Sequence, residues 1–161
     1  MLVRPATHDD VAEIARVHVE SAEAAYGSLA PASDAELARR VANWTAMLDD
    51  PSRSPFVAES AGRIVGVLSI GPASAEVGVG ELHVLYVHPD WWGRGAGQQL
   101  IDRAHRELAR SFSTAVLTVI ASNPRARRFY ERNDWRLDTV VIEKHFGHPI
   151  EVARYTRTLE R

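Results

Sequence analysis

The most informative part of the sequence is Leu85-Tyr86-Val87-His88-Pro89-Asp90-Trp91-Trp92-Gly93-Arg94-Gly95-Ala96-Gly97-Gln98. An apolar strand ends at Val87, Pro89 marks a turn, and three alternate glycines lead into a segment with helical periodicity. Glycines let backbone N–H groups converge on a ligand without a Cβ in the way, and the amino end of a helix favours a phosphate. Arg94 adds a formal positive charge. The stretch therefore predicts a phosphate-binding loop at a strand-to-helix junction.

The spacing of these residues excludes two better-known phosphate loops. There is no Gly-Lys-Ser/Thr ending, which a nucleoside triphosphatase loop requires. The glycines follow a G-x-G-x-G pattern rather than G-x-G-x-x-G, and the loop follows a central strand instead of opening the fold. Glycines alone are equally compatible with a connection that binds nothing, but the strand-loop-helix context favours a ligand.

Strands and helices are predicted on both sides of this loop. Helical spacing of apolar residues, with capping residues and breakers, predicts the helices, and short apolar or alternating runs between turn residues predict the strands. In chain order we expect a strand over 2–4, helices over 7–26 and 33–48, strands over 56–59, 64–70 and 81–87, a helix over 95–110, a strand over 115–120, a helix over 123–133, and strands over 135–146 and 150–159.

This order of elements predicts the fold class. Two strand-helix-strand crossovers in the second half imply parallel pairing there, whereas the first strands and the last pair have the short connections of hairpins. We expect a mixed α/β (α+β) fold with a central mixed sheet of about seven strands and helices on both faces. No linker, repeat or low-complexity segment interrupts the chain, so residues 1–161 are predicted to form a single domain.

Composition restricts the classes of function. The chain is 45% hydrophobic and 25% charged, which is typical of a globular domain, and its lack of cysteine excludes disulfides, thiolate zinc sites and cysteine nucleophiles. A net charge of -2 does not indicate a nucleic-acid-binding face, and no apolar stretch approaches the roughly 20 residues of a membrane helix. The amino end has no signal-peptide pattern. We expect a cytoplasmic protein without a metal site and without nucleic-acid or membrane partners.

Two motifs resemble one known family. Leu85-Tyr86-Val87-x-Pro89 followed by Gly93-x-Gly95-x-Gly97 resembles the acetyl-CoA pyrophosphate loop of the GNAT superfamily of N-acetyltransferases. Asn123-Pro-Arg-Ala126-Arg-Arg-Phe129-Tyr130-Glu131 resembles that family's second signature, on a helix after the next strand, and the order of elements resembles the family's fold over nearly all 161 residues. The resemblance implies an N-acetyltransferase that moves an acetyl group from acetyl-CoA to a primary amine of a small molecule, peptide or protein.

Two positions depart from the family's pattern. Trp92 stands where the family usually has Gln or Arg, but that position acts largely through its backbone, so we expect the loop to be kept. Asp134 stands where the family often has Gly before an aromatic residue. Asp is among the few residues tolerated in a left-handed C-cap, so the helix end is also expected to be kept.

The resemblance also implies which residues bind acetyl-CoA. In the family two neighbouring strands splay apart and the pantetheine arm bonds between them, which assigns this role to the backbone of residues 85–87, with an N–H near Leu85 directed at the thioester oxygen. Asn123 is expected to bond the pantetheine, to cap the following helix, or both. Arg125, Arg127 and Arg128 are equally compatible with steering the 3′-phosphate and with a solvated helix face. The expected cofactor-binding residues are Leu85, Tyr86, Val87, Trp92, Gly93, Arg94, Gly95, Ala96, Gly97, Gln98, Asn123, Ala126 and Phe129.

The expected catalytic residues are Tyr130 as general acid and Glu81 as general base. Tyr130 matches the position of the family's acid, and a phenol with a pKa of about 10 is protonated at neutral pH and can donate to a departing thiolate. Regular alternation places Glu81 and His83 on one face of their strand together with Leu85, and either could accept the amine proton directly or through water. A structural role suits Glu81 or His83 equally well, and many family members use an ordered water instead.

The acceptor is less determined by the sequence. In the family the first two helices and the last hairpin form the acceptor pocket, where acidic and aromatic side chains would suit a cationic amine but would equally suit an ordinary helix surface. The candidates are Glu20, Glu23, Tyr26, Trp44, Glu143 and His145. The sequence does not choose among a small amine, an amino acid, an antibiotic and a protein amine, nor between monomer and homodimer. A non-catalytic acyl-CoA-binding regulatory module is the alternative from another class.

Overall fold

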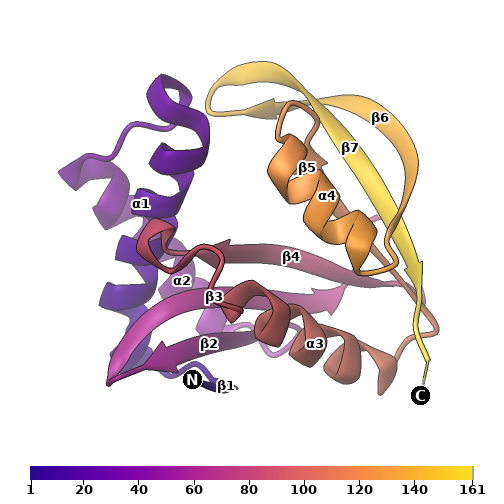
Figure 1. Cartoon of the computed structure of the whole chain (residues 1–161), viewed down its shortest axis with the longest axis horizontal. Coiled ribbons are helices and arrows are strands. Elements are labelled where there is room, and N and C mark those ends of the chain that lie inside the picture. Colours follow the sequence, from indigo (N-terminus) through magenta and orange to yellow (C-terminus); the bar gives the residue numbers. More distant parts are fainter. Residues whose placement is uncertain (161) are drawn as a thin grey trace.

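A seven-stranded mixed sheet organises the computed structural model, which describes residues 1–160 (Figure 1). The strand order is β1-β2-β3-β4-β5-β7-β6. The strands are β1 (Leu2–Pro5), β2 (Ser54–Ser60), β3 (Arg63–Pro72), β4 (Gly80–Val87), β5 (Thr114–Ile120), β6 (Arg136–His145) and β7 (His148–Thr158). The α-helices are α1 (Val11–Tyr26), α2 (Asp34–Asp49), α3 (Ala96–Ala109) and α4 (Pro124–Arg132). The predicted mixed α/β fold is confirmed.

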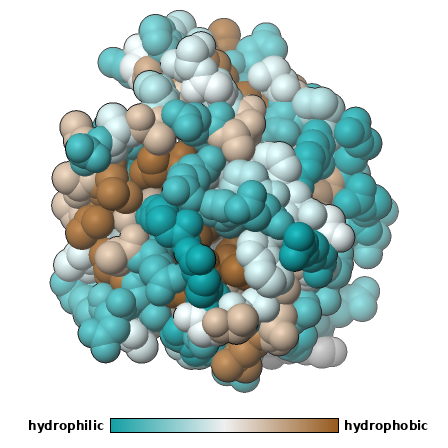
Figure 2. All heavy atoms as spheres, turned by 60° about the vertical axis from the view of Figure 1, so that its left-hand side comes forward, coloured by the Kyte–Doolittle hydropathy of each residue, from teal (hydrophilic) through white to brown (hydrophobic). Residues whose placement is uncertain are grey.

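Helices cover both faces of this sheet. One apolar cluster includes Trp44 of α2 and Val67 of β3, and the other includes Leu68 of β3 and Leu100 of α3. The adjacent residues Val67 and Leu68 thus point to opposite clusters, as expected of a strand that is buried on both faces. Figure 2 shows the side that carries α1 and α2, where hydrophilic residues cover most of the surface and smaller hydrophobic patches lie between them. No described helix is long and apolar enough to cross a membrane.

In the first turns of α2, one carboxylate is paired with two arginines. Ser33 caps the helix, because its hydroxyl accepts a hydrogen bond from the Glu36 backbone N–H at 3.1 Å. The Glu36 carboxylate forms ion pairs with Arg39 and, at 2.8 Å, with Arg40. One carboxylate therefore serves two guanidinium groups on this helix.

The sheet opens between β4 and β5. These strands pair in parallel only at Gly80–Ala115 and Glu81–Val116, and Figure 1 shows β5 and β7 turning away from β4 beyond that point. Residues 82–87 of β4 stay paired with β3, except at one irregular position, but no described strand pairs with their other edge. Backbone polar groups on this edge need other partners, so they are available to a ligand. This is the separation of neighbouring strands that the family resemblance implies.

The predicted parallel pairing is correct for the first crossover and wrong for the second. α4 connects β5 to β6, but β7 lies between those two strands and pairs antiparallel with both. Burial explains the order, because Val152, Ala153 and Tyr155 of β7 are buried whereas nearly every residue of β6 is exposed. Phe146 and Gly147 both have positive φ, as a tight hairpin between the two strands requires.

A β-bulge interrupts the alternation of β4. Ser69 pairs with Val84 and Ile70 pairs with Leu82, so His83 is the extra residue. Beyond it, Val84 packs against the cluster of α1 and α2, whereas Leu85 packs against the cluster of α3. The expectation that His83 and Leu85 share a face is therefore wrong, because an inserted residue shifts the alternation by one position.

Candidate active site

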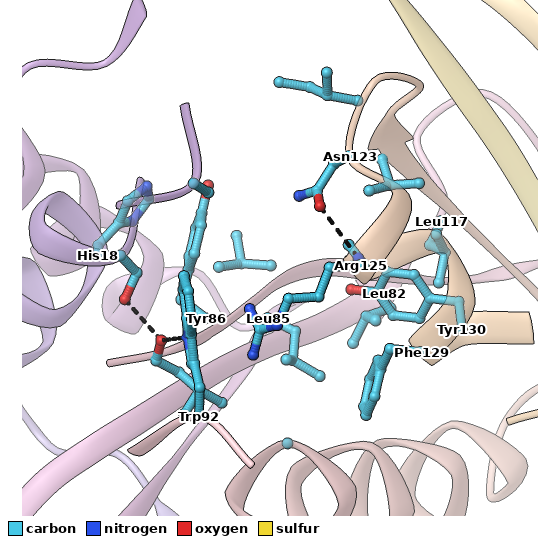
Figure 3. Close-up of a pocket in the computed structure, with 18 of the residues that line it drawn as sticks. His18, Leu82, Leu85, Tyr86, Trp92, Leu117, Asn123, Arg125, Phe129 and Tyr130 are labelled. Carbon is cyan, nitrogen blue, oxygen red and sulfur yellow. Dashed lines mark hydrogen bonds between the residues drawn. The ribbon is translucent and has the colours of Figure 1, made fainter. Parts of the chain in front are cut away.

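A cavity of about 760 Å³ lies where β4 and β5 diverge (Figure 3). Residues of both strands line it, together with residues of α1, α2, the glycine loop, α4 and the β6–β7 hairpin. This volume is within the range of small-molecule sites. Among the described residues that line it there is no Asp or Glu, but there are four arginines: Arg40, Arg125, Arg128 and Arg132. The cavity therefore favours anionic groups.

The glycine loop forms one wall of this cavity. Gly93 and Gly95 have φ values of 75° and 88°, which favour glycine, and Gly95 is the N-cap of α3. Gly97 lies in the first turn of α3, where a Cβ would be 3.5 Å from the Phe129 ring, an ordinary van der Waals contact. The packing of the protein alone therefore does not require glycine at this position. Room on the cavity side and the free N–H groups of the first helical turn instead suit a phosphate.

Nearly all of the predicted cofactor-binding residues come together here. Those that line the cavity are Leu85, Tyr86, Val87, Trp92, Gly93, Gly95, Ala96, Gly97, Gln98, Asn123, Ala126 and Phe129. Arg94 is not among the lining residues, and its guanidinium lies 5.0 Å from the ring centroid of Trp91. The side-chain amide of Gln98 is bonded to Asp102 and Asn133, so only the rest of the residue is free for a ligand.

Trp92 connects the glycine loop to β4 and to α4. Its indole N–H donates to the Val87 carbonyl at 2.8 Å, and the Ser21 hydroxyl donates to the same oxygen at 3.0 Å. The guanidinium of Arg125 lies 3.7 Å from the Trp92 ring centroid, a cation–π contact that reaches across the cavity (Figure 3). Sequence reasoning missed this pair, although the unusual Trp in the loop was its signal.

Asn123 connects α4 to α1. Its side-chain oxygen accepts a hydrogen bond from the Ala126 backbone N–H at 3.2 Å, which confirms the predicted capping role. Its amide nitrogen donates to the Tyr26 hydroxyl at 3.1 Å. The Tyr26 ring in turn contacts Phe146 of the β6–β7 turn, with 5.6 Å between ring centroids. These contacts join α1, α4 and the hairpin around one end of the cavity.

The three neighbouring arginines of α4 divide into two groups. Arg125 and Arg128 line the cavity, as a role in binding phosphate requires. Arg127 does not line it, and its guanidinium donates to the Tyr155 hydroxyl and to the Ala121 carbonyl, both at 3.0 Å. Arg127 therefore holds α4 against the sheet.

Tyr130 has the surroundings that a proton donor requires. Its ring is buried in the cavity wall with the hydroxyl directed into the cavity (Figure 3), and no described residue forms a hydrogen bond with that hydroxyl. Burial raises the pKa of Tyr130 above its ordinary value, and the nearby phenols of Tyr26 and Tyr86 raise it further. Tyr130 therefore keeps its proton and has no competing acceptor, so it can donate to a leaving group.

Tyr86 and His18 lie together on the opposite wall, with 4.4 Å between ring centroids. Burial raises the pKa of Tyr86 to about 12. The His18 Nδ1 accepts a hydrogen bond from the Trp44 indole at 3.0 Å, and burial lowers the pKa of His18 to about 3. At neutral pH His18 is therefore uncharged with its proton on Nε2, so both residues can act as uncharged hydrogen-bond donors.

Glu81 and His83 are in contact, but only His83 reaches the cavity. The Glu81 Oε2 lies 2.9 Å from the His83 Nδ1. His83 lines the cavity, and Glu81 is not among its described lining residues. The His83 Nε2 is buried without a hydrogen-bond partner. Because an imidazole that donates from Nδ1 keeps a lone pair on Nε2, this arrangement can accept a proton at His83.

The candidates for the acceptor pocket are only partly placed there. Tyr26 and His145 line the cavity, whereas Trp44 is buried in the core behind His18. The predicted acidic residues are not among the described lining residues. Glu20 and Glu23 have partners away from the cavity, and Glu143 bonds to His145. Helical periodicity marks a helix but does not tell which exposed positions face a cavity, and it gave no signal for Arg40.

Comparisons with known proteins agree with this geometry. The model of the acetyltransferase (GNAT) family matches residues 9–135. Over 144 residues the chain is 34% identical to an uncharacterised N-acetyltransferase of Archaeoglobus fulgidus, covering 84% of this chain and 93% of that protein. The fold is similar to that of ribosomal-protein-alanine N-acetyltransferase from Brucella melitensis, with a TM-score of 0.80, 20% identity, and coverage of 99% and 100% of the two chains. It is also similar to yncA of Salmonella typhimurium, solved with its cofactor acetyl-CoA, with a TM-score of 0.74, 20% identity, and coverage of 99% and 94%.

Proposed function

Because this chain belongs to the acetyltransferase (GNAT) family, we propose that it transfers an acetyl group from acetyl-CoA to a primary amine. The observation that carries the proposal is the cavity between the diverging strands β4 and β5, with Tyr130 directed into it from one wall and His83 among its lining residues. A proton donor and a proton acceptor at one cavity are what acyl transfer to an amine requires.

The residues present fit acetyl-CoA. Gly97 leaves open a space that a Cβ would occupy, the first turn of α3 offers free N–H groups, and Arg125 and Arg128 supply positive charge for phosphates. The free edge of β4 offers backbone hydrogen bonds to an extended amide-bearing arm. When bound, acetyl-CoA would supply an acetyl group activated as a thioester.

The chain's own residues would manage the protons and the charge. Backbone N–H groups of 85–87 would stabilise negative charge that develops on the reacting carbonyl oxygen. Tyr130 would donate its hydroxyl proton to the departing sulfur, since burial keeps that proton in place until it is needed.

The amine must lose a proton to attack a carbonyl. We assign this proton to the His83 Nε2, which is buried in the free protein and must become accessible when the amine binds, while Glu81 contacts the other ring nitrogen. Glu81 is then a positioning residue, since it is not among the described residues that line the cavity. This assignment revises the prediction of Glu81 as the group that takes the proton itself.

Release of free thiol from acetyl-CoA in the presence of a panel of primary amines tests the proposal. We expect thiol release that depends on both the enzyme and an amine. Saturable binding of acetyl-CoA without release across a broad panel would contradict the proposal and favour a non-catalytic acyl-CoA-binding module. The two residues that would then have no chemical role are Tyr130 and His83.

A further inference from the structure

We propose that the acceptor amine carries a carboxylate, as an amino acid does, and that Arg40 binds this carboxylate. The inference rests on the proposed acetyl transfer and names the class of acceptor. It begins from the charges that surround the cavity.

The cavity must hold both substrates, yet its described lining contains no acidic residue. Three of its four arginines, Arg125, Arg128 and Arg132, belong to α4, where phosphates bound by the glycine loop would account for them. Arg40 belongs to α2, on the other face of the sheet. Arg40 lines the cavity together with His18 and Tyr86, and its charge lowers the pKa of both. Phosphates bound at the glycine loop would not account for this fourth cation.

Arg40 has hydrogen-bonding capacity to spare. Its Nε donates to the Glu36 carboxylate at 2.8 Å, and it makes no other hydrogen bond to a described residue. The same carboxylate also pairs with Arg39, so the three side chains keep a net positive charge. The two terminal nitrogens of Arg40 are therefore free for a planar oxyanion, the group that a guanidinium binds best.

The neighbouring groups favour the same ligand. His18 offers an N–H from Nε2, because its Nδ1 accepts from the Trp44 indole. Tyr86 offers a hydroxyl that no described residue engages. Because the described lining holds donors but no carboxylate, it stabilises an anion and leaves a second ammonium group without a partner. Polyamines are therefore disfavoured as acceptors, and amino acids are favoured.

Matched pairs of acceptors test this inference. Each pair consists of an amino acid and the amine that remains when its carboxylate is removed. The pairs are leucine with 3-methylbutylamine, phenylalanine with phenethylamine, and methionine with 3-(methylthio)propylamine. We expect kcat/KM to favour the amino acid by roughly 10- to 100-fold, the range of one charge-assisted pair. Arg40→Gln should remove this preference mainly by raising the KM of the amino acid, and Arg40→Lys should restore part of it.

Arg39→Gln is the control, because Arg39 pairs with the same carboxylate but does not line the cavity. It should leave the preference intact. A readout without turnover is calorimetric binding of the N-acetyl amino acid to the protein with coenzyme A bound, which Arg40→Gln should weaken by roughly 10-fold or more.

Three results would decide against the inference. Decarboxylated amines that react as well as their amino acids would remove its basis. Equal effects of Arg40→Gln and Arg39→Gln would assign Arg40 to the helix surface. Unchanged binding of the N-acetyl amino acid in Arg40→Gln would do the same. Transfer to neither kind of amine would instead contradict the proposed acetyl transfer itself.

Discussion

At the scale of single residues, three tyrosine hydroxyls meet at the cavity in different surroundings. Tyr26 accepts a hydrogen bond from Asn123, and Tyr86 lies against His18. Tyr130 comes from α4, its hydroxyl forms no hydrogen bond to a described residue, and its ring contacts Phe129 and Trp135 rather than an imidazole. Among the three, it alone matches the family's acid, and its burial and free hydroxyl support that role.

Tyr130→Phe should lower kcat by roughly 100-fold or more while the KM for acetyl-CoA changes little, because only the proton donor is lost. Single-turnover kinetics would check this. Tyr155→Phe is the control, since its hydroxyl bonds Arg127 and Glu131 and does not line the cavity. Full single-turnover rates in Tyr130→Phe would return Tyr130 to a packing role.

The contact between Glu81 and His83 predicts an ordered pair of defects. His83→Gln should lower kcat/KM by roughly 100-fold at neutral pH, and Glu81→Gln by a smaller factor, because His83 keeps its lone pair without its orienting partner. Both losses should shrink as the pH rises, since the amine then deprotonates in solution. A pH–rate profile of the two variants and of the double variant measures this.

The double variant should be little worse than His83→Gln, as expected of residues that act as a unit. A larger defect in Glu81→Gln than in His83→Gln would make Glu81 the proton acceptor. Normal rates in both would point to a water held by backbone groups.

At the scale of elements, the junction of the glycine loop with α3 combines two kinds of glycine. Gly95 has positive φ and serves the backbone, whereas Gly97 is helical and has room for a Cβ. The two should therefore respond differently to the same substitution.

Gly97→Ala should leave the unfolding free energy of the free protein unchanged or raise it by about 0.5–1 kcal/mol, because alanine favours a helix. It should also weaken acetyl-CoA binding by roughly 10-fold or more, since the methyl group occupies space that the phosphates of the coenzyme would fill. Gly95→Ala should lower both stability and binding, because its φ of 88° strains alanine. Chemical denaturation and calorimetry measure the two effects. Unimpaired binding in Gly97→Ala would remove the phosphate site from this loop.

The elements also show what a sequence can predict. Every predicted strand and helix is present, and Asp134 has the left-handed conformation expected of its position, with φ of 67°. The place of β7 between β5 and β6 was not predicted, because it depends on which strand buries more of its residues. The bulge at His83 was not predicted either, since it arises from pairing with β3 and leaves no mark in the alternation of β4.

The site residues show the same contrast between features set by local sequence and features set by tertiary packing. Those fixed by a motif, such as Gly97 and Tyr130, lie at the cavity. Those that depend on the rotation of a helix about its own axis, such as Arg40 on α2 or Glu23 on α1, were missed or misplaced. Periodicity separates the buried face of a helix from its exposed face, but tertiary packing decides which exposed residue borders a cavity.

At the scale of the whole molecule, one buried and one partly buried histidine connect stability to pH. His18 accepts from Trp44 on one face of the sheet, and His105 accepts from Trp135 at 3.1 Å on the other. Burial lowers the pKa of His18 to about 3 and that of His105 to about 4. The unfolded chain binds protons near pH 6.5 that the folded chain excludes, so folding stability is lost as the pH falls below that value.

The unfolding free energy should therefore fall as the pH is lowered from 7 to 5, with a contribution from His18 of up to about 1.4 kcal/mol per pH unit and a smaller one from the more accessible His105. Chemical denaturation at pH 7, 6 and 5 measures this slope. His18→Gln and His105→Gln should each reduce it, and His148→Gln, at an exposed position, should not. A stability that does not change between pH 7 and 5 would contradict the neutral state of both histidines.

The most direct test of the whole account follows the acetyl group itself. The protein is incubated with acetyl-CoA labelled with ¹³C in the acetyl group and with an amine acceptor, and the masses of the amine and of the coenzyme are measured together. The account predicts that the amine gains the labelled acetyl group in step with the release of free coenzyme A, and that Tyr130→Phe slows both equally. Tight binding of acetyl-CoA with no labelled amine from any acceptor would contradict it.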